Sequence, residues 1–306
     1  MTTPLATVFA GTPEFAVPSL EALLRRADVV LRAVYTQPDR PAGRGRRLTA
    51  SPVKRCALAA GLPVEQPETL RDAAAQATLA GYAPDLLVVA AYGLLLPDEV
   101  LALTPYPLNV HASLLPRWRG AAPVQRALLA GDAVSGISIM RIVRRLDAGP
   151  VWLRRTCPIG PDETAGSLHD KLARLGAEAL AAALDRLAAG DVSEQPQDET
   201  GVTYAAKLTA ADRALDFGQP AVVLERQVRA LNPLPGARAR LGALEIKVLA
   251  ARVVPGRGAA GTIVAHSADG IDVATAHELL RLTSVQPPGR QAMSAAAFLN
   301  GYGDQL

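Results

Sequence analysis

The sequence predicts an α/β protein with a doubly wound, Rossmann-like parallel sheet followed by a C-terminal OB-like β-barrel domain. Three observations support this fold class. The chain begins with a strand–helix–strand pattern, which favours a parallel sheet. The strongly apolar stretch Asp85–Tyr92 suits a central strand that is buried on both faces. Short strands joined by glycine turns fill the last third of the chain, which is typical of a small antiparallel barrel.

Length and composition set broad limits on what the protein does. With 306 residues, of which 49% are hydrophobic and 20% charged, the chain is long enough for two globular domains. The apolar run Leu86–Leu96 is too short to span a bilayer, and we recognise no signal peptide, so we expect a cytoplasmic protein. Cys56 and Cys157 are far apart and lack a CxxC partner, which predicts two reduced thiols. The net charge of +3 is too mild to establish nucleic-acid binding.

The first strands and helices alternate as a doubly wound sheet requires. Strands over Ala6–Ala10 and Val29–Thr36 enclose a helix over Val17–Arg26. The turn at Gly11 lacks the GxGxxG pattern, so we interpret it as a tight turn at the sheet edge and not as a dinucleotide site. The other elements predicted before the central strand are a helix at 53–60, a short strand at 63–66 and a helix at 69–80.

An arginine-rich segment, residues 37–48, interrupts this alternation. It holds four arginines, two glycines and two prolines within twelve residues, and it has no apolar periodicity. A solvated loop explains this composition. A loop that meets an anion explains it equally well, because guanidinium groups match the geometry of phosphate and glycines let the backbone adapt. The four arginines are Arg40, Arg44, Arg46 and Arg47.

Polar side chains alternate with apolar ones along the strand that ends near Ser113. Asn109 and His111 therefore point to the same side, about 6.5–7 Å apart along the chain. Pro116 ends the strand, and the carboxyl end of a strand in an α/β sheet is where ligands usually bind. An amide and a titratable ring side by side suit acid–base chemistry. Taken alone, a single histidine on a strand is more often a hydrogen-bonded structural residue.

The middle of the chain completes the first domain. Asp147 lies in the loop 143–150, and an aspartate before a small residue and a glycine is usually part of a turn. The segment 191–207 begins as a polar stretch without periodicity, and we interpret it as an interdomain linker. The predicted domains are therefore 1–190 and 208–306. The elements predicted between Gly120 and the linker are helices at 121–130 and 165–189 and strands at 136–142 and 151–159.

The last hundred residues change character. Short strands and glycine turns dominate, and a helix over Val222–Leu231 precedes most of them. The run from His277 to Arg281 begins like the zinc motif HExxH but ends in arginine within strand sequence, so we dismiss it as a metal site. The predicted strands are 214–217, 237–241, 244–254, 261–265, 270–274 and 279–285, and a final helix is predicted at 294–300.

One long motif resembles a known family. It runs Asn109-Val110-His111-Ala112-Ser113-Leu114-Leu115-Pro116-Arg117-Trp118-Arg119-Gly120-Ala121-Ala122-Pro123. This stretch resembles the active-site segment of the folate-dependent formyltransferases, and it is most similar to those members that act on methionyl-tRNA. The resemblance implies transfer of the formyl group of 10-formyltetrahydrofolate to the α-amino group of initiator methionyl-tRNA, for translation initiation.

The resemblance also implies roles for single residues. Asn109, His111 and Asp147 match the family's catalytic positions, and the turn Ser113-Leu114-Leu115-Pro116 matches its folate-binding segment. The arginine-rich segment resembles the loop that enters the acceptor arm of tRNA, so Arg40, Arg44, Arg46 and Arg47 are expected tRNA contacts, with Arg44 ranked first. The chain departs from the family at Val143 and Arg145, where an acidic residue and a glycine are usual.

The implied chemistry needs few groups. The amide of Asn109 and the ring of His111 can each donate a hydrogen bond to the oxyanion that forms when an amine attacks a formyl carbon. Asp147 can orient His111 and help to move the proton of the amine. General acid–base help of this kind contributes about 10²–10⁴ in rate. The reaction requires neither a metal nor a covalent intermediate.

Two alternatives remain open at this point. A formyltransferase acting on a small amine, such as a nucleotide sugar or a glycinamide ribotide, would share the fold and the catalytic residues but would need neither the arginine-rich segment nor the barrel. A non-catalytic tRNA-binding protein would need those two features but not Asn109, His111 and Asp147 together. No heptad or exposed apolar stripe requires a dimer, so we expect a monomer.

Overall fold

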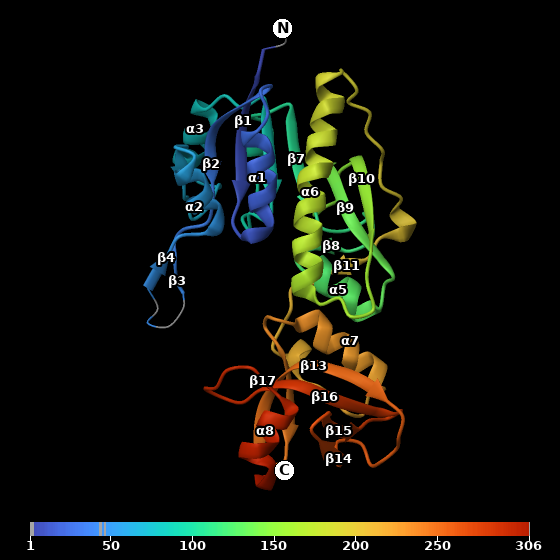
Figure 1. Ribbon diagram of the computed structural model, residues 1–306. Coiled ribbons are helices and arrows are strands. Elements are labelled where there is room, and N and C mark those ends of the chain that lie inside the picture. Colours follow the sequence, from blue (N-terminus) through green and yellow to red (C-terminus); the bar gives the residue numbers. More distant parts are fainter. Residues whose placement is uncertain (1–2, 43–44, 46, 306) are drawn as a thin grey trace. The chain divides into compact units, whose positions relative to one another are not determined.

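The computed structural model describes residues 3–42, 45 and 47–305, and it divides into two compact units (Figure 1). The first unit comprises Met1–Gly120, Val134–Pro158 and His169–Tyr204. The second comprises Ala121–Ala133, Ile159–Leu168 and Ala205–Leu306. Each unit has its own sheet. Within the described residues, none of the helices is both long and apolar enough to span a membrane.

A seven-stranded sheet in the order β10-β9-β7-β6-β1-β2-β5 forms the core of the first unit. The chain leaves β1 first toward β2 and β5 and then toward β6 and β7, all in parallel, so the sheet is doubly wound as predicted. β9 and β10 extend it in antiparallel pairing. The strands are β1 Leu5–Gly11, β2 Val29–Tyr35, β5 Val64–Glu65, β6 Leu86–Ala90, β7 Tyr106–His111, β9 Val134–Arg141 and β10 Val151–Pro158.

Helices cover both faces of this sheet. On one face, alternate residues of β1 such as Val8 join a buried cluster with Leu79 of α3 (Ala73–Gly81) and Val100 of α4 (Asp98–Leu101). On the other face lie α1 (Val17–Leu24) and α6 (Ala165–Ala188) (Figure 1). A Cβ built on Gly176 of α6 would lie 3.0 Å from the side chain of Val110, so this helix packs closely on β7. The helix α6 thereby supports the strand that carries Asn109 and His111.

The arginine-rich segment is more regular than its composition predicted. Its two ends pair as an antiparallel ribbon of β3 (Arg40–Ala42) and β4 (Arg47–Thr49), with Arg40 opposite Thr49. The expectation of an irregular loop was therefore wrong for these ends. Because β4 is exposed along its length, no alternation of apolar residues marked it in the sequence. Arg44 and Arg46 lie outside the described residues.

After the ribbon, α2 (Pro52–Ala59) begins as the sequence predicted. The Ser51 hydroxyl accepts a hydrogen bond from the Lys54 amide, and proline occupies the first helical position. The Lys54 ammonium in turn donates to Asp39 at 2.7 Å and to Gln66 at 2.7 Å. This lysine ties the base of the ribbon to α2, so its charge is already paired.

The second unit is built on an antiparallel sheet in the order β12-β13-β16-β15-β14, as predicted for this part of the chain. Its core contains Leu224 and Val228 of α7 (Ala221–Leu231) against strand residues such as Ile246. The helix α5 (Pro123–Ala130) also belongs to this unit. The strands are β12 Ala237–Leu241, β13 Leu244–Val254, β14 Ile263–Ser267, β15 Gly270–Ala274, β16 Leu279–Gln286 and β17 Met293–Ser294, and the final helix is α8 Ala295–Tyr302.

The strand predicted at 214–217 is wrong. Ala214 makes one isolated bridge to Arg238, after a short 3₁₀ turn at Ala211–Arg213. The Asp216 carboxylate then accepts a hydrogen bond from the Gly218 amide at 2.9 Å. Aspartate side chains that bond the backbone two residues on form turns, and this turn prevents further pairing.

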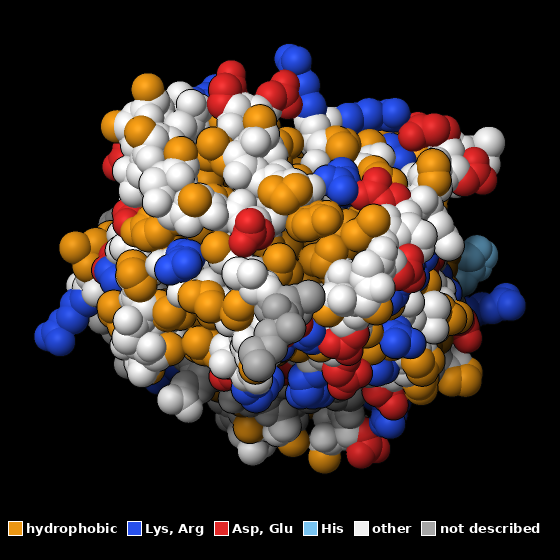
Figure 2. All heavy atoms as spheres, turned by 90° about the horizontal axis from the view of Figure 1, so that it is seen from above, with side chains coloured by type: hydrophobic (Ala, Val, Ile, Leu, Met, Phe, Trp, Pro, Cys, Tyr) orange, Lys and Arg blue, Asp and Glu red, His pale blue; other side chains and the backbone are white. Residues whose placement is uncertain are grey.

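The surface carries charges of both signs. On the face seen in Figure 2, blue and red side chains alternate and neither sign forms a continuous field. This distribution agrees with the mild net charge of +3. On this face, only local groups of arginines can attract a polyanion.

Candidate active site

β7 places two of the predicted catalytic side chains. It lies between β6 and β9, with Asn109 opposite Met140 and His111 opposite Ser138 on the β9 side. Asn109 is half-buried, and in the part of the chain that the structure describes no group hydrogen-bonds its side chain. His111 is 6% exposed. The amide of Asn109 is therefore available to a ligand at the carboxyl end of this strand.

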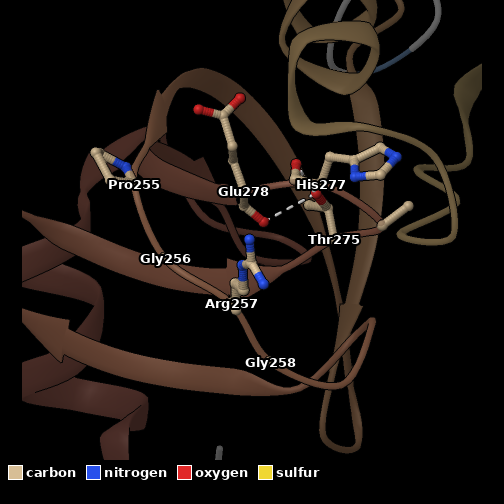
Figure 3. A pocket seen from close by; sticks show the side chains of 8 residues that line it. Pro255, Gly256, Arg257, Gly258, Thr275, His277 and Glu278 are labelled. Atoms are coloured by element: carbon tan, nitrogen blue, oxygen red, sulfur yellow. Dashed lines mark hydrogen bonds between the residues drawn. The ribbon is translucent and has the colours of Figure 1, made fainter.

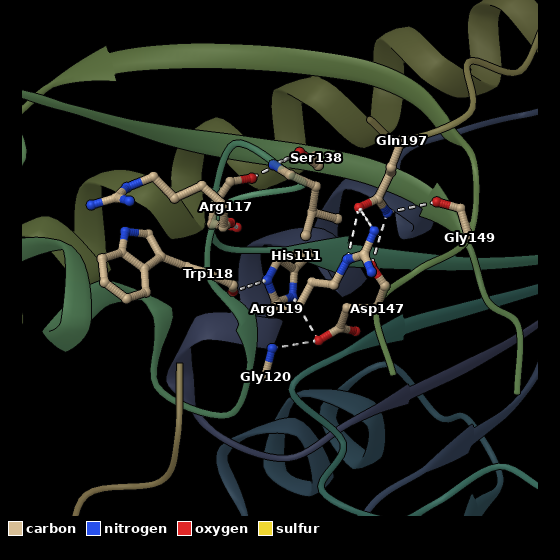
Figure 4. A network of polar contacts seen from close by, with 11 residues as sticks. His111, Arg117, Trp118, Arg119, Gly120, Ser138, Asp147, Gly149 and Gln197 are labelled. Atoms are coloured by element: carbon tan, nitrogen blue, oxygen red, sulfur yellow. Dashed lines mark hydrogen bonds and ion pairs between the residues drawn. The ribbon is translucent and has the colours of Figure 1, made fainter. Parts of the chain in front are cut away.

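The ring of His111 lies between a backbone carbonyl and a carboxylate (Figure 4). Its Nε2 is 2.9 Å from the carbonyl oxygen of Trp118, and its Nδ1 is 3.7 Å from Oδ2 of Asp147. Because a carbonyl only accepts hydrogen bonds, Nε2 carries a hydrogen. At 3.7 Å the Nδ1 atom is too far from the carboxylate for a direct hydrogen bond. Nδ1 is thus the ring atom from which a bond to a ligand can be made.

Asp147 is held in place through both its side chain and its backbone. Its Oδ2 accepts a hydrogen bond from the Gly120 amide at 2.8 Å. Its backbone adopts φ +45°, in the left-handed region that residues other than glycine rarely occupy. Such a conformation persists only where the surroundings enforce it. The structure thus brings together His111 and Asp147, two residues that lie 36 positions apart (147 − 111) in the sequence.

Gln197 reaches this loop from the segment predicted as the linker. Its Nε2 donates to the carbonyl oxygens of Asp147 at 2.8 Å and of Gly149 at 2.7 Å. Its Oε1 accepts from Nε and Nη2 of Arg119 at 3.0 and 2.8 Å. Arg119 is fully buried, and Figure 4 shows its guanidinium directed at Gln197. Residues 191–204 pack within the first unit.

Hydrogen bonds within the predicted folate-binding turn and from Ser138 of β9 hold this turn in place. The Ser113 hydroxyl donates to the Arg117 carbonyl at 2.6 Å. The hydroxyl of Ser138 donates to the Ser113 carbonyl at 2.8 Å and accepts from the Leu115 amide at 3.1 Å. Ser113 and Leu115 are buried, whereas Leu114 and Pro116 are half-buried. Leu114 and Pro116 therefore present the side-chain surface of this turn that a ligand can reach, while Ser113 and Leu115 determine its shape.

The residues that depart from the family pattern do not leave an unbalanced charge. The Arg145 guanidinium donates to Oε2 of Glu199 at 2.8 Å, and Arg119 donates to Oε1 of the same carboxylate at 3.3 Å. The hydrogen bond from Arg145 lowers the pKa of Glu199, burial opposes this effect, and Arg119 reinforces it. The positive charge that Arg145 adds beside the catalytic loop is thus met by a carboxylate from the same segment as Gln197.

Two of the four predicted tRNA contacts lie on the ribbon. Arg40 and Arg47 are exposed, and Arg40 donates to the Gln37 side chain at 2.8 Å. Arg44 and Arg46 fall outside the described residues. Both described guanidinium groups are accessible, as contact with a phosphate backbone requires.

The second unit contains a hollow of about 660 Å³ lined by Arg257, Thr275, His277 and Glu278 (Figure 3). The Thr275 hydroxyl donates to the backbone carbonyls of His277 and Glu278, so it is already used within the turn. In Figure 3 the His277 ring and the Glu278 carboxylate point in different directions. His277 and Glu278 lie outside a helix and cannot form the zinc-binding face that HExxH requires, which agrees with its dismissal.

Sequence reasoning missed three residues of this site. Arg119 stood within the recognised motif, yet nothing in its neighbours distinguished a buried guanidinium from a surface one. Gln197 stood in a polar segment with no periodicity, and Ser138 on a strand that only its register places beside the turn. Pairing between distant segments determines all three positions, and a single sequence carries no direct signal of it.

Known proteins resemble the chain along its length. Residues 5–184 match the family model described as formyl transferase, and residues 207–303 match the formyl transferase C-terminal domain. The chain is 54% identical to the methionyl-tRNA formyltransferase of Halorhodospira halophila, over 96% of this chain and 95% of that protein. It is 53% identical to the methionyl-tRNA formyltransferase of Stenotrophomonas maltophilia, over 97% of both.

Solved structures share the fold at much lower identity. A sugar 3N-formyl transferase, WlaRD, superposes with a TM-score of 0.70 at 13% identity and covers 95% of this chain and 100% of that one. HypX from Aquifex aeolicus in complex with tetrahydrofolic acid gives a TM-score of 0.65 at 18% identity, over 98% of this chain and 48% of HypX. At these identities the likeness concerns the fold.

Proposed function

This chain belongs to the formyl transferase family, and from that premise we propose that it transfers the formyl group of 10-formyltetrahydrofolate to the α-amino group of methionyl-initiator tRNA. The observation that carries the proposal is identity above 50% with methionyl-tRNA formyltransferases over nearly the whole chain. The geometry supports it, because His111 at the end of β7 lies 3.7 Å from Asp147, and Asn109 precedes His111 by two residues on the same strand. The product, N-formylmethionyl-tRNA, serves translation initiation.

In the proposed mechanism, Asn109 and His111 stabilise the developing charge. The amine nitrogen of the methionyl group attacks the formyl carbon, a carbon–nitrogen bond forms, and the formyl oxygen becomes an oxyanion. The amide of Asn109 donates one hydrogen bond to that oxygen. Because Nε2 of His111 already donates to the Trp118 carbonyl, Nδ1 donates the second bond only when the ring is protonated on both nitrogens, and the proposed mechanism uses the ring in that form. Donors placed in advance and sheltered from water stabilise the oxyanion without having to reorient.

Asp147 and His111 then take part in proton transfer from the attacking amine to the folate. The ammonium that forms on attack loses a proton to the Asp147 carboxylate, which His111 stabilises from 3.7 Å away. The same proton is returned to N10 of the folate as the bond from N10 to the formyl carbon breaks. The amine therefore gains a formyl group, the folate gains a hydrogen, and no oxidant or metal takes part in the balance. General acid–base catalysis of this type contributes about 10²–10⁴ in rate.

Binding of the two substrates falls to different surfaces. We assign the folate to the turn that ends at Pro116, with Leu114 and Pro116 as side-chain contacts and with Ser113 and Leu115 shaping the turn. The tRNA is assigned to the second unit and to the arginines of the segment 37–48, which are Arg40, Arg44, Arg46 and Arg47. Phosphate contacts of this kind fix the position of the acceptor arm. We propose that a single chain in the cytoplasm carries out the whole reaction.

The test is formylation of charged initiator tRNA by the purified protein with 10-formyltetrahydrofolate, beside charged elongator methionyl-tRNA and a nucleotide-linked amino sugar. Formyl-methionine on the initiator tRNA alone is the expected result. Formylation of the amino sugar alone would replace the acceptor and keep the chemistry. Tight binding of tRNA without any product would contradict the enzymatic proposal and support a non-catalytic tRNA-binding protein.

A further inference from the structure

We propose that Gln197, oriented by Arg119, is a positioning residue that holds the catalytic loop so that Asp147 faces His111. This inference rests on the proposed function for the meaning of Asp147, but its structural content can be tested separately. Gln197 belongs to a segment that begins after α6, and it is 9% exposed. It touches none of the atoms assigned to the reaction, and it acts only through the loop.

The loop that carries Asp147 needs such support. Asp147 itself has φ +45°, a conformation disfavoured for a residue with a Cβ atom. Two residues on, a Cβ at Gly149 would lie 1.9 Å from the carbonyl oxygen of Arg141, so the chain passes very close to β9 at that point. A loop with this backbone strain and this close approach adopts a single conformation only when residues outside the loop stabilise it.

Gln197 supplies two of the stabilising hydrogen bonds at once. Its Nε2 donates to the Asp147 and Gly149 carbonyls at 2.8 and 2.7 Å and so fixes the loop on both sides of Ala148. The orientation of the amide follows from the chemistry of its partners, because Arg119 offers only donors and the two carbonyls only accept. Glutamine is thus matched to this site, since it presents an acceptor to one side and two donors to the other.

Arg119 makes that orientation mandatory. Its guanidinium is fully buried, and the Oε1 atom of Gln197 accepts from two of its nitrogens. Its third nitrogen, Nη1, is buried and has no hydrogen-bond partner among the described residues. Its other acceptor is the exposed Glu199 carboxylate, at the longer distance of 3.3 Å. A buried guanidinium with so few acceptors depends strongly on each one. The next residue, Gly120, donates its amide to the Asp147 carboxylate, so β8 (Arg119–Gly120) contacts the side chain of the aspartate directly and its backbone through Gln197.

The segment that carries Gln197 is itself fastened at two places. Gln195 and Val151 of β10 exchange backbone hydrogen bonds at 2.8 and 2.9 Å. Thr203 accepts from the amides of Trp118 and Arg119, each at 2.9 Å. Gln197 therefore lies in a segment, residues 195–203, that is hydrogen-bonded at both ends, and we call this segment the strap. Its fixed ends limit the movement of the Gln197 side chain away from the loop.

The test compares two identical substitutions, Gln197→Glu and Gln195→Glu. A glutamate in place of Gln197 would keep the acceptor that Arg119 needs but would place a carboxylate against two carbonyl oxygens. Gln195 also accepts from an arginine, Arg154 at 3.1 Å, but within the described residues it makes no hydrogen bond to the catalytic loop. Q195E is therefore the matched control. Both proteins are assayed for kcat, for KM of each substrate, for thermal unfolding and for amide exchange at Gly120.

We expect Q197E to lower kcat by about 100-fold, the scale set by a misplacement of about 1 Å in a catalytic group. Both KM values should stay within about threefold of wild type. The thermal midpoint should not fall, because Arg119 gains a second charged partner beside Glu199. The Gly120 amide, bonded to Asp147 Oδ2, should exchange at least about tenfold faster. Q195E should behave as wild type in all four measurements.

Three results would overturn the inference: an unchanged kcat in Q197E, a loss of kcat with Gly120 exchange equal to that of Q195E, or equal losses in both variants. If Q197E does not fold, Gln197→Asn keeps the amide but shortens its reach, and full kcat in Q197N would overturn the inference. If the wild type forms no formylmethionyl-tRNA, the proposed function fails, while the exchange rate at Gly120 still decides the positioning role.

Discussion

At the scale of single residues, the site separates atoms that are occupied from atoms that are available. The Nε2 atom of His111, the Oδ2 atom of Asp147 and the Ser113 hydroxyl each have a hydrogen-bond partner within the protein. The Asn109 amide has none among the described residues, and Nδ1 of His111 lies 3.7 Å from the Asp147 carboxylate. Catalysis by a prearranged site requires this division, since donors that are already satisfied cannot strengthen their bonds in the transition state.

The role of His111 gives a direct prediction. His111→Ala should lower kcat by about 10²–10⁴-fold, because it removes a donor to the oxyanion and a partner of Asp147. Affinity for tRNA should remain within about threefold, since the ring is buried and away from the exposed arginines. Single-turnover formylation and a tRNA filter-binding assay measure the two effects. A large loss of tRNA affinity in the folded variant would show that the ring is structural.

The pairing of Glu199 predicts a pH dependence. Hydrogen bonding from Arg145 places the pKa of Glu199 below its ordinary value of 4.5 in the folded protein. The stabilisation is therefore complete above about pH 4.5 and is lost as the pH falls through the lower, folded value. Glu199→Gln should lower the thermal midpoint slightly at pH 7, and its difference from wild type should shrink as the pH falls below 4.5.

The control for that experiment is Glu68→Gln. Glu68 is exposed, and no arginine pairs with it within the described residues. Its substitution should change the midpoint by the same small amount at every pH. A constant difference between wild type and E199Q from pH 7 to pH 3 would mean that the Arg145–Glu199 pair contributes nothing measurable, as many exposed pairs do.

At the scale of elements, hydrophobic periodicity identified the strands that pack against the core. The alternation around Asn109 and the apolar run of β6 predicted two neighbouring strands, and the structure pairs them in parallel. The ribbon of β3 and β4 gave no such signal, because β4 is exposed along its whole length. The strand predicted at 214–217 failed because a local bond to Asp216 competed with the ladder. The hydrophobic pattern therefore predicts strands that pack against a core, and it misses exposed strands such as β4.

Sequence reasoning likewise predicted some residues of the candidate site and missed others. His111 and Asp147 were predicted through resemblance, since neither spacing nor periodicity relates a strand residue to a loop residue that only the fold brings close to it. Gln197 and Ser138 were not predicted at all. Both act through hydrogen bonds to backbone carbonyls, and such contacts impose little on residue type along the sequence. The supporting parts of a site are therefore harder to find than the reacting ones.

The ribbon carries a prediction of its own. Alanine at Arg40, Arg44, Arg46 or Arg47 should weaken tRNA use, and removal of one phosphate contact should reduce the slope of log affinity against log salt by about 1. Arg44→Ala should have the largest effect, and KM for the folate should not change. Arg32→Ala, at an exposed position on β2, is the matched control. An unaltered salt slope in all four variants would exclude the ribbon as a phosphate contact.

At the scale of the whole molecule, the chain builds its first unit from three stretches that the second unit interrupts. Residues 191–204 belong to the first unit although they follow α6, and they contribute Gln197, Glu199 and Thr203 to the surroundings of the site. A division of the chain at residue 190, which we predicted from composition, would assign these side chains to a connecting segment. Their hydrogen bonds indicate a structural role in the first unit.

Truncation tests this assignment. A fragment 1–206 retains the acceptor for Arg119, whereas a fragment 1–190 leaves that buried guanidinium without it. Loss of the partner of a buried charge costs about 3 kcal/mol, which corresponds to a thermal midpoint about 5–10 °C lower. Thermal unfolding of both fragments by circular dichroism measures the difference. Equal midpoints would show that residues 191–206 are a linker in the ordinary sense.

The strap that carries Gln197 also bears on how the protein becomes active as it is synthesised. Asn109, His111 and Asp147 emerge from the ribosome well before Gln197, with all of α6 translated in between. A nascent chain therefore possesses every reacting group for some time before it possesses the residue that aligns them. The site is thus completed only after the polar segment that holds Gln197 has been made and has packed against the sheet, whose seven strands all precede it in the sequence.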